Sequence, residues 1–278
     1  MEYEQLEYHC GATIEIIKHI PRRLRGAGTT RAKKSAAEIE EANARYAARK
    51  LVRKLNANFR PGDVHTILTY DGKQGRPTPD EAREIIRLFH QGMRKEFRKR
   101  KVPYKYILVT EYENKAIHHH IVINQINDGK VTTNDLVRKC WRAAGGTGRP
   151  KYVDLDDTGE YEKLAVYLIK ETDKTYKKPG GFKQRYSCSR NLVDPQPEKR
   201  IMHVKGMWSM EPKARPGYRL LPDLTYNGSD KLGYPYQRYY MVKIAPSPED
   251  WEAAEVTLRR KRKRRKKGEH NERKKRDA

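Results

Sequence analysis

The stretch TEYENKAIHHHIVIN, Thr110–Asn124, places three consecutive histidines directly before three β-branched residues. Two strand-like segments, Tyr104–Glu113 and Ile117–Asn124, are separated by only three residues, which is too few for a crossover connection. We therefore expect an antiparallel hairpin. In the register of a symmetric turn, Glu111 lies directly across from His118.

Side chains alternate between the two faces of a strand, so the three histidines divide between these faces. His118 and His120 share a face with Glu111, and His119 points to the opposite, apolar face. Two imidazoles and one carboxylate can bind a divalent metal and leave coordination positions open for a substrate. Glu113, diagonal to His118, is a competing ligand. A cross-strand polar pair without a metal is the alternative interpretation.

A helix expected over Glu160–Lys174 carries two tyrosines on different faces. At 100° per residue, Tyr167 lies in a row of lysines, whereas Tyr161 lies on the apolar side. Ammonium groups favour the anion of a neighbouring phenol, which makes Tyr167 the candidate nucleophile. A solvated helix face carrying one ordinary tyrosine is the alternative. The lysines of the row are Lys163, Lys170 and Lys174.

The charge of the chain indicates a polyanionic partner. The 278 residues include 61 Lys plus Arg against 36 Asp plus Glu, a formal net charge of +25. The segment Arg259–Ala278 contributes strongly and is expected to be a disordered basic tail. No apolar run reaches the roughly 18 to 20 residues of a membrane span, and no secretion signal is visible, so we expect a soluble intracellular protein. The three cysteines form no CxxC pair and predict neither a disulfide framework nor a zinc site.

Alternating strand and helix patterns predict an α+β fold. Strands are expected over VHTILTY (Val64–Tyr70), in the histidine hairpin and over Lys151–Asp156, with a long helix that begins at Thr78 and Pro79. The expected divisions are an N-terminal extension with a helix (1–60), a catalytic domain (61–192), an irregular Tyr/Pro/Gly-rich region (193–258) and the basic tail (259–278).

Three motifs follow one another along the chain: the strand VHTILTY, the HHHIV run after an acidic residue, and Tyr167-Leu-Ile-Lys170. Together they resemble the HUH endonuclease superfamily, and more closely the rolling-circle replication initiators of small bacterial plasmids and single-stranded DNA phages. The resemblance extends over roughly Arg45–Leu192, including the flanking stretch KQRYSCSRNL. One departure is His119, where the family usually has a bulky hydrophobe.

The resemblance implies an antiparallel sheet of the RNA-recognition or ferredoxin-like type, with the histidine strand in its centre and the tyrosine helix across its face. It implies that Tyr167 attacks single-stranded DNA and becomes linked to a 5′-phosphate, while Lys170 offsets charge in the transition state. Mn²⁺ or Mg²⁺ would be held by Glu111, His118 and His120. Thr66 and Thr69 either contact phosphate or only pair across strands. The residues assigned to DNA contact are Lys163, Lys174, Thr66, Thr69 and Arg185.

The resemblance also implies partners: single-stranded DNA at a replication origin, with a host polymerase, in the cytoplasm of a bacterial host and without a membrane. No GxxxxGK[ST] motif is present, so unwinding would depend on a host helicase. Two alternatives stay open. One is a relaxase or single-tyrosine transposase with the same chemistry, and the other is a non-catalytic, RRM-like nucleic-acid-binding protein.

Overall fold

The computed structural model describes residues 1–21, 35–113, 116–172, 184–230 and 233–252. The chain divides into two compact units. The central unit comprises Lys33–Leu55 and Phe59–Leu192, and the terminal unit comprises Met1–Ala32, Asn56–Asn58 and Val193–Ala278. Each unit contains an antiparallel sheet, and helices accompany them, so the predicted α+β class is confirmed.

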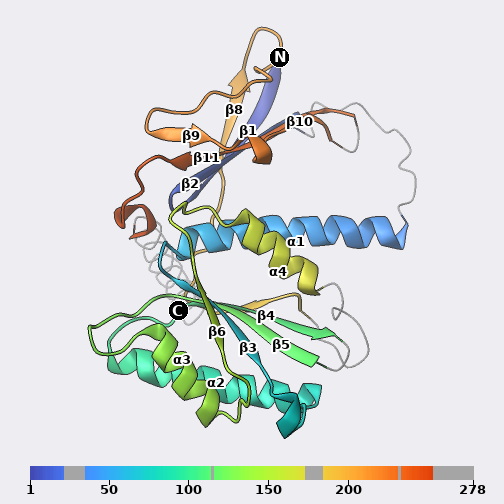
Figure 1. The fold of residues 1–278 in the computed structure, drawn as a ribbon. Helices are drawn as coiled ribbons and strands as arrows, with labels where there is room; N and C mark the ends of the chain where they lie inside the picture. Colours follow the sequence, from blue (N-terminus) through green and yellow to red (C-terminus); the bar gives the residue numbers. More distant parts are fainter. Residues whose placement is uncertain (22–34, 114–115, 173–183, 231–232, 253–278) are drawn as a thin grey trace, which may run out of the picture. The chain divides into compact units, whose positions relative to one another are not determined.

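The sheet of the central unit has five antiparallel strands in the order β6-β3-β5-β4-β7 (Figure 1). The histidine strand β5 lies in the centre, between β3 and β4, as the resemblance implied. The backbone of β5 is therefore hydrogen-bonded on both sides, which fixes its side chains firmly. The strands are β3 Val64–Thr69, β4 Tyr106–Glu113, β5 Ala116–Ile123, β6 Lys151–Asp154 and β7 Ser187–Cys188.

Helices cover both faces of this sheet (Figure 1). The side chains of β5 alternate between two apolar cores, because Ile121 and Ile123 pack with α2 and α3 whereas Val122 packs with α1 and α4. Among the described residues, no helix has both the length and the apolar content of a membrane span. The helices of the unit are α1 Ala36–Asn58, the short η2 Gly72–Gln74, α2 Pro79–Lys99, α3 Thr133–Ala143 and α4 Glu162–Thr172.

Local signals place the starts of three of these helices. Helix α2 begins with the capping box of Thr78 and Glu81, followed by Pro79, as the sequence predicted. Similar boxes begin α1 at Ser35 and α3 at Thr132. In each box the cap hydroxyl and an acidic side chain satisfy backbone N–H groups that have no partner inside the helix.

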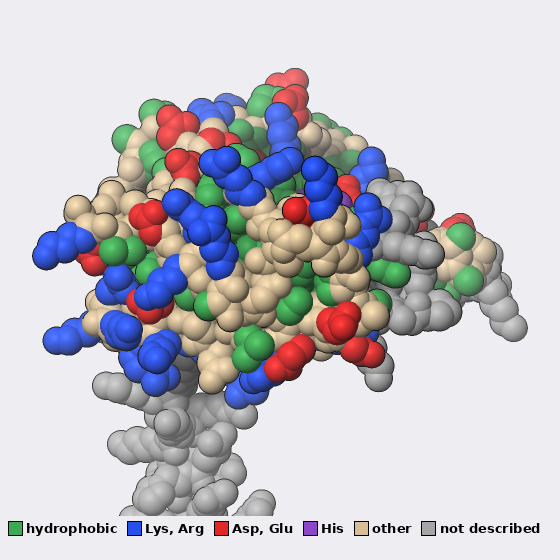
Figure 2. All heavy atoms as spheres, turned by 60° about the horizontal axis from the view of Figure 1, so that its bottom comes forward, with side chains coloured by type: hydrophobic (Ala, Val, Ile, Leu, Met, Phe, Trp, Pro, Cys, Tyr) green, Lys and Arg blue, Asp and Glu red, His purple; other side chains and the backbone are tan. Residues whose placement is uncertain are grey.

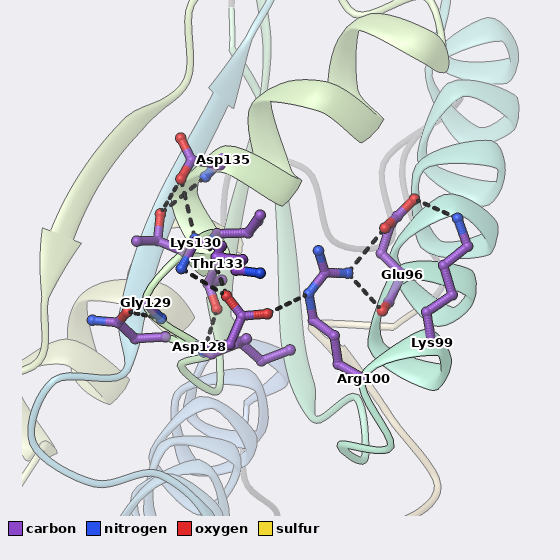
Figure 3. Close-up of polar contacts among 12 residues, drawn as sticks. Glu96, Lys99, Arg100, Asp128, Gly129, Lys130, Thr133 and Asp135 are labelled. Carbon is purple, nitrogen blue, oxygen red and sulfur yellow. Dashed lines mark hydrogen bonds and ion pairs between the residues drawn. The ribbon is translucent and has the colours of Figure 1, made fainter.

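A buried carboxylate joins the two helices of the α2/α3 layer. Glu96 on α2 accepts hydrogen bonds from Lys139 of α3 at 2.9 Å and from Arg100 at 3.0 Å. Arg100 also lies 3.4 Å from Asp128 in the loop before α3. Figure 3 shows Arg100 between these two carboxylates. The hydrogen bond from Lys139 is the main reason that the pKa of Glu96 falls to about 2, so the carboxylate stays charged and holds the layer together.

The terminal unit corrects two expectations about the ends of the chain. Residues 193–258 are not irregular, and residues before 21 form a hairpin: together they build a sheet in the order β10-β11-β2-β1-β8, with β9 paired to β11. The tail 259–278 lies outside the described residues. The elements are β1 Glu2–Cys10, β2 Thr13–His19, β8 Glu198–His203, β9 Tyr218–Leu220, η3 Pro222–Leu224, β10 Tyr226–Ser229 and β11 Pro235–Lys243.

Buried charged side chains hide these strands from a hydropathy pattern. Glu7 is 1% exposed because Arg215 forms two hydrogen bonds of 2.6 Å with its carboxylate. Glu15 and Lys18 on β2 are buried as well. Paired charges occupy positions where an apolar residue would have indicated a strand, so the alternation of apolar and polar residues is lost.

Candidate active site

The histidine hairpin has the predicted register. Glu111 of β4 pairs directly with His118 of β5, and the pair Glu113–Ala116 closes the ladder beside the turn. On the other side of β5, His118 pairs with Thr69 and His120 with Ile67 of β3. Residues that pair directly point to the same face, so Glu111, His118 and His120 share the face covered by α1 and α4.

The carboxylate of Glu111 lies between the two imidazoles. Its Oε2 atom is 3.7 Å from Nε2 of His120 and 4.0 Å from Nδ1 of His118. Glu111 and His120 are buried, whereas the His118 side chain is 38% exposed. The cluster is thus enclosed at His120 and open to solvent at His118.

A third histidine orients His120. Nε2 of His65, on β3, lies 3.3 Å from Nδ1 of His120 in a hydrogen bond, and the two rings stack with centroids 5.5 Å apart. Burial lowers the pKa of both to about 4, with Glu171 acting in the opposite direction on His120. Both imidazoles are therefore neutral at pH 7. When Nδ1–H of His120 donates to His65, its Nε2 presents a lone pair toward Glu111.

Helix α4 brings Tyr167 to this cluster. The ring of Tyr167 meets that of His120 edge-on, with centroids 5.5 Å apart, and the tyrosine is 42% exposed. Tyr161 is 3% exposed and belongs to the core under α1 and α4, where burial raises its pKa far above the usual range. Tyr167 is therefore the tyrosine at the histidine cluster, and Tyr161 is a core residue.

His119 belongs to the opposite core. It is 1% exposed, and its ring nitrogens contact the Thr110 hydroxyl at 2.9 Å and the Tyr70 hydroxyl at 3.0 Å. Trp141 packs edge-on against the same ring. Burial lowers the pKa of His119 to about 3, so it is neutral as well. The division of the triple histidine between two faces follows the predicted alternation.

The segment that carries this cluster matches a known family. Residues 63–176 match the model of the family described as replication-associated protein ORF2/gene-2 protein. These residues form a replication-associated domain of that family. The sequence resemblance to rolling-circle replication initiators is thereby confirmed, and Glu111, His118, His120 and Tyr167 all lie inside the matched segment. No curated protein and no solved structure matches the chain significantly.

The lysines expected beside Tyr167 are only partly described. Lys163 and Lys170 of the replication-associated domain are exposed on α4, on the side of Tyr167 that faces away from the core. Lys174 lies outside the described residues. The side chain of Glu113, the competing ligand, is likewise not described.

Two of the residues assigned to DNA contact lie elsewhere in the replication-associated domain or its flank. Thr66 is fully buried and pairs with Ile121, so it points to the α2/α3 face, away from the histidine cluster. Thr69 is half-buried across from His118 and shares the face of the cluster. Arg185 is buried and forms an ion pair with Glu40 of α1 and a hydrogen bond of 3.0 Å to the Thr172 hydroxyl. Those contacts make Arg185 a structural residue.

Sequence reasoning missed His65 and Glu171. Strand alternation in VHTILTY places His65 and Thr69 on one face and Thr66 on the other, so the pattern that divided the histidines could have identified His65. Glu171 is the next residue after Lys170, half-buried on α4, and its charge acts on His120. Its proximity depends on the packing of α4, for which the sequence carries no signal.

The donors fit a divalent metal in type and direction. Nε2 of His120 is buried and has no hydrogen-bond partner among the described residues, while Glu111 supplies an anionic oxygen 3.7 Å away. In the described part of the chain, no group of three His, Cys, Asp or Glu side chains is already drawn close enough to enclose an ion. A buried ring nitrogen without a partner is unfavourable, which is consistent with a ligand to be recruited.

Proposed function

We propose that this protein nicks and rejoins single-stranded DNA through a covalent phosphotyrosine and thereby initiates rolling-circle replication of a phage or plasmid. The observation that carries the proposal is the position of Tyr167, whose ring contacts His120 beside Glu111 and His118, inside a replication-associated domain. A sheet that only bound nucleic acid would need no such combination of phenol, carboxylate and imidazoles. On this basis we assign the central sheet to the HUH type.

The proposed reaction is an exchange of one phosphodiester for another. The Tyr167 oxygen attacks the scissile phosphorus and loses its proton to water, and the bond between phosphorus and the 3′ oxygen breaks. The 3′ oxygen takes up a proton and leaves as a free 3′-OH, while the 5′-phosphate stays on the tyrosine. Rejoining reverses these steps and needs no ATP, because the new bond is of the same kind.

Each residue of the cluster has a role in this scheme. Glu111, His118 and His120 would hold a divalent ion, and His65 fixes the ring of His120 in the orientation that a ligand needs. When bound, the ion polarises the scissile phosphate. Two imidazoles favour Mn²⁺ over Mg²⁺, since Mg²⁺ prefers oxygen ligands.

The exposed lysines of α4 suit a negatively charged substrate. Lys170 lies one turn after Tyr167 and would offset charge on the phosphate in the transition state. Lys163, one turn before, would hold a neighbouring phosphate, and Thr69 stands across from the exposed His118. The proposed partners are single-stranded DNA at a replication origin, with a host helicase and polymerase, in the bacterial cytoplasm.

The decisive experiment compares two conservative variants. The parent, Tyr167→Phe and Tyr161→Phe are each incubated with a pool of single-stranded oligonucleotides and Mn²⁺, and tyrosine-linked nucleotides are mapped by mass spectrometry. We expect adducts on Tyr167 in the parent and in Tyr161→Phe, and none in Tyr167→Phe, although that variant still binds DNA. Lys170→Ala should slow adduct formation by roughly 10- to 1000-fold with binding less affected. An adduct on Tyr161, or no adduct in the parent, would overturn the proposal.

A further inference from the structure

A cavity of about 530 Å³ opens in the central unit, on the side of the sheet that carries α3. Its walls come from α3, from the loop GGTGRP (Gly145–Pro150) and from Tyr152 of β6. Three guanidiniums line this cavity, which we call the arginine pocket: those of Arg138, Arg142 and Arg149. Figure 2, in which the α2/α3 side is turned forward, shows that Lys and Arg side chains are frequent on that side of the molecule.

The charge of the arginine pocket is not neutralised from within. Arg138 forms an ion pair of 3.0 Å with Asp135. Within the described residues, no carboxylate pairs with Arg142 or Arg149. The charges of both Arg138 and Arg149 act on the Tyr152 phenol, which shows that they converge on one wall of the cavity. Convergent guanidiniums without carboxylates form a site for phosphate groups.

The loop that shapes the pocket is rigidly held. A Cβ atom on Gly146 would lie 2.0 Å from the Trp141 ring, and one on Gly148 would lie 2.1 Å from the Thr69 carbonyl oxygen. The Trp141 indole N–H donates to the Gly148 carbonyl at 3.0 Å, and the Asp71 backbone N–H donates to the Thr147 hydroxyl at 2.9 Å. The loop therefore keeps its shape without a ligand, which lowers the entropic cost of binding one.

The pocket adjoins the end of the sheet where the histidine cluster lies. The Gly148 N–H donates to the Thr69 carbonyl at 3.1 Å, and Thr69 pairs with His118. Two strand spacings, roughly 10 Å, therefore separate the loop from the histidine strand. About three phosphate spacings of a B-form strand cover that distance.

From this placement we infer that the arginine pocket binds the phosphate groups of the DNA strand that flanks the nick, so that the strand passes from His118 around the end of β3 to Arg142 and Arg149. This inference rests on the proposed function for its nick and names a second contact region for the same substrate. The shared chemistry is that of phosphate esters, and a free nucleotide is the other source that the test distinguishes.

The test is a salt titration of DNA binding without a divalent ion, so that no cleavage interferes. Binding of a labelled single-stranded 30-mer is measured by fluorescence anisotropy for the full-length parent, R142A/R149A and the control K95A/R98A. The control removes two exposed charges of α2 outside the pocket. For R142A/R149A, the slope of log K against log salt should flatten by about 1.4, because each lost phosphate contact on a single strand contributes about 0.7. Affinity near 0.1 M salt should fall on the order of 10-fold, and the control should keep the parent slope.

The outcomes separate this inference from the proposed nicking reaction. Equal slopes for the parent and R142A/R149A would overturn the inference, even if Tyr167 still forms its adduct. An altered slope would support it, even if no adduct formed. If dAMP, titrated calorimetrically, bound the parent but not R142A/R149A while the 30-mer slopes stayed equal, the pocket would be a nucleotide site and the strand path would be wrong. Circular dichroism and thermal unfolding verify that the variants, altered only at exposed positions, remain folded.

Discussion

Replacing His119 by alanine should damage stability and spare chemistry. The side chain is 1% exposed, and truncation of a fully buried side chain costs about 2–5 kcal/mol. It would also remove the hydrogen-bond partner of Thr110, which is 9% exposed, and that of half-buried Tyr70. An unpaired buried group costs about 1–3 kcal/mol, and part of that cost overlaps with the truncation. We expect a total of about 3–5 kcal/mol, or a fall in Tm of about 6–20 °C.

The assay pairs stability with covalent chemistry across the three histidines. Urea unfolding is followed by tryptophan fluorescence, to which Trp141 beside His119 contributes. Adduct formation is measured well below the Tm with saturating oligonucleotide. His118→Ala should lose less than about 1 kcal/mol, because its side chain is 38% exposed, and yet abolish the adduct. His120→Ala should also abolish it. His119→Ala should keep substantial activity.

The opposite pattern would refute the reasoning. If His119→Ala unfolded at the same urea concentration as the parent and formed no adduct, His119 would belong to the reacting cluster. The faces of β5 would then be exchanged relative to the structure.

Three further predictions concern other parts of the chain. Burial lowers the pKa of His90 to about 3, so its neutral form contributes stability that is complete above its unfolded pKa of about 6.5 and is lost as the pH falls toward 3; between pH 7 and 5, the urea unfolding free energy of His90→Phe should fall by about 2 kcal/mol less than that of the parent. Gly148→Ala should lower the unfolding free energy by about 1–3 kcal/mol, since its Cβ would collide with Thr69, and a variant as stable as the parent would show that the loop can move. Deletion of Arg259–Ala278 should flatten the salt dependence of DNA binding but leave adduct formation at saturating oligonucleotide nearly unchanged, whereas loss of the adduct would place the tail in the reaction.

The sequence was sufficient where neighbouring segments determine geometry. The short connection between β4 and β5 leaves one favourable register, which places Glu111 opposite His118. The helical period likewise separates buried Tyr161 from exposed Tyr167. These relations depend on a few residues at a time, so they can be obtained without knowledge of the whole fold.

It was insufficient where distant segments meet. The contact of His65 with His120 needs the pairing of β3 with β5, and the ion pair of Arg185 with Glu40 needs the packing of α1. The terminal sheet combines strands from both ends of the chain, and no local pattern indicates such a pairing. Buried ion pairs such as Glu7 with Arg215 make those strands resemble exposed segments.

The central position of β5 has a consequence for errors in folding. A shift of one residue along its neighbours would turn every side chain of the strand to the other face. Because three histidines stand in a row, His119 would then enter the cluster alone, while His118 and His120 would enter the core beside Trp141. Such a misregistered state would lose one metal donor and both cores in a single step. Insertion of one residue beside the Glu113–Ala116 pair is therefore predicted to act as a switch, with either the complete site or none of it formed.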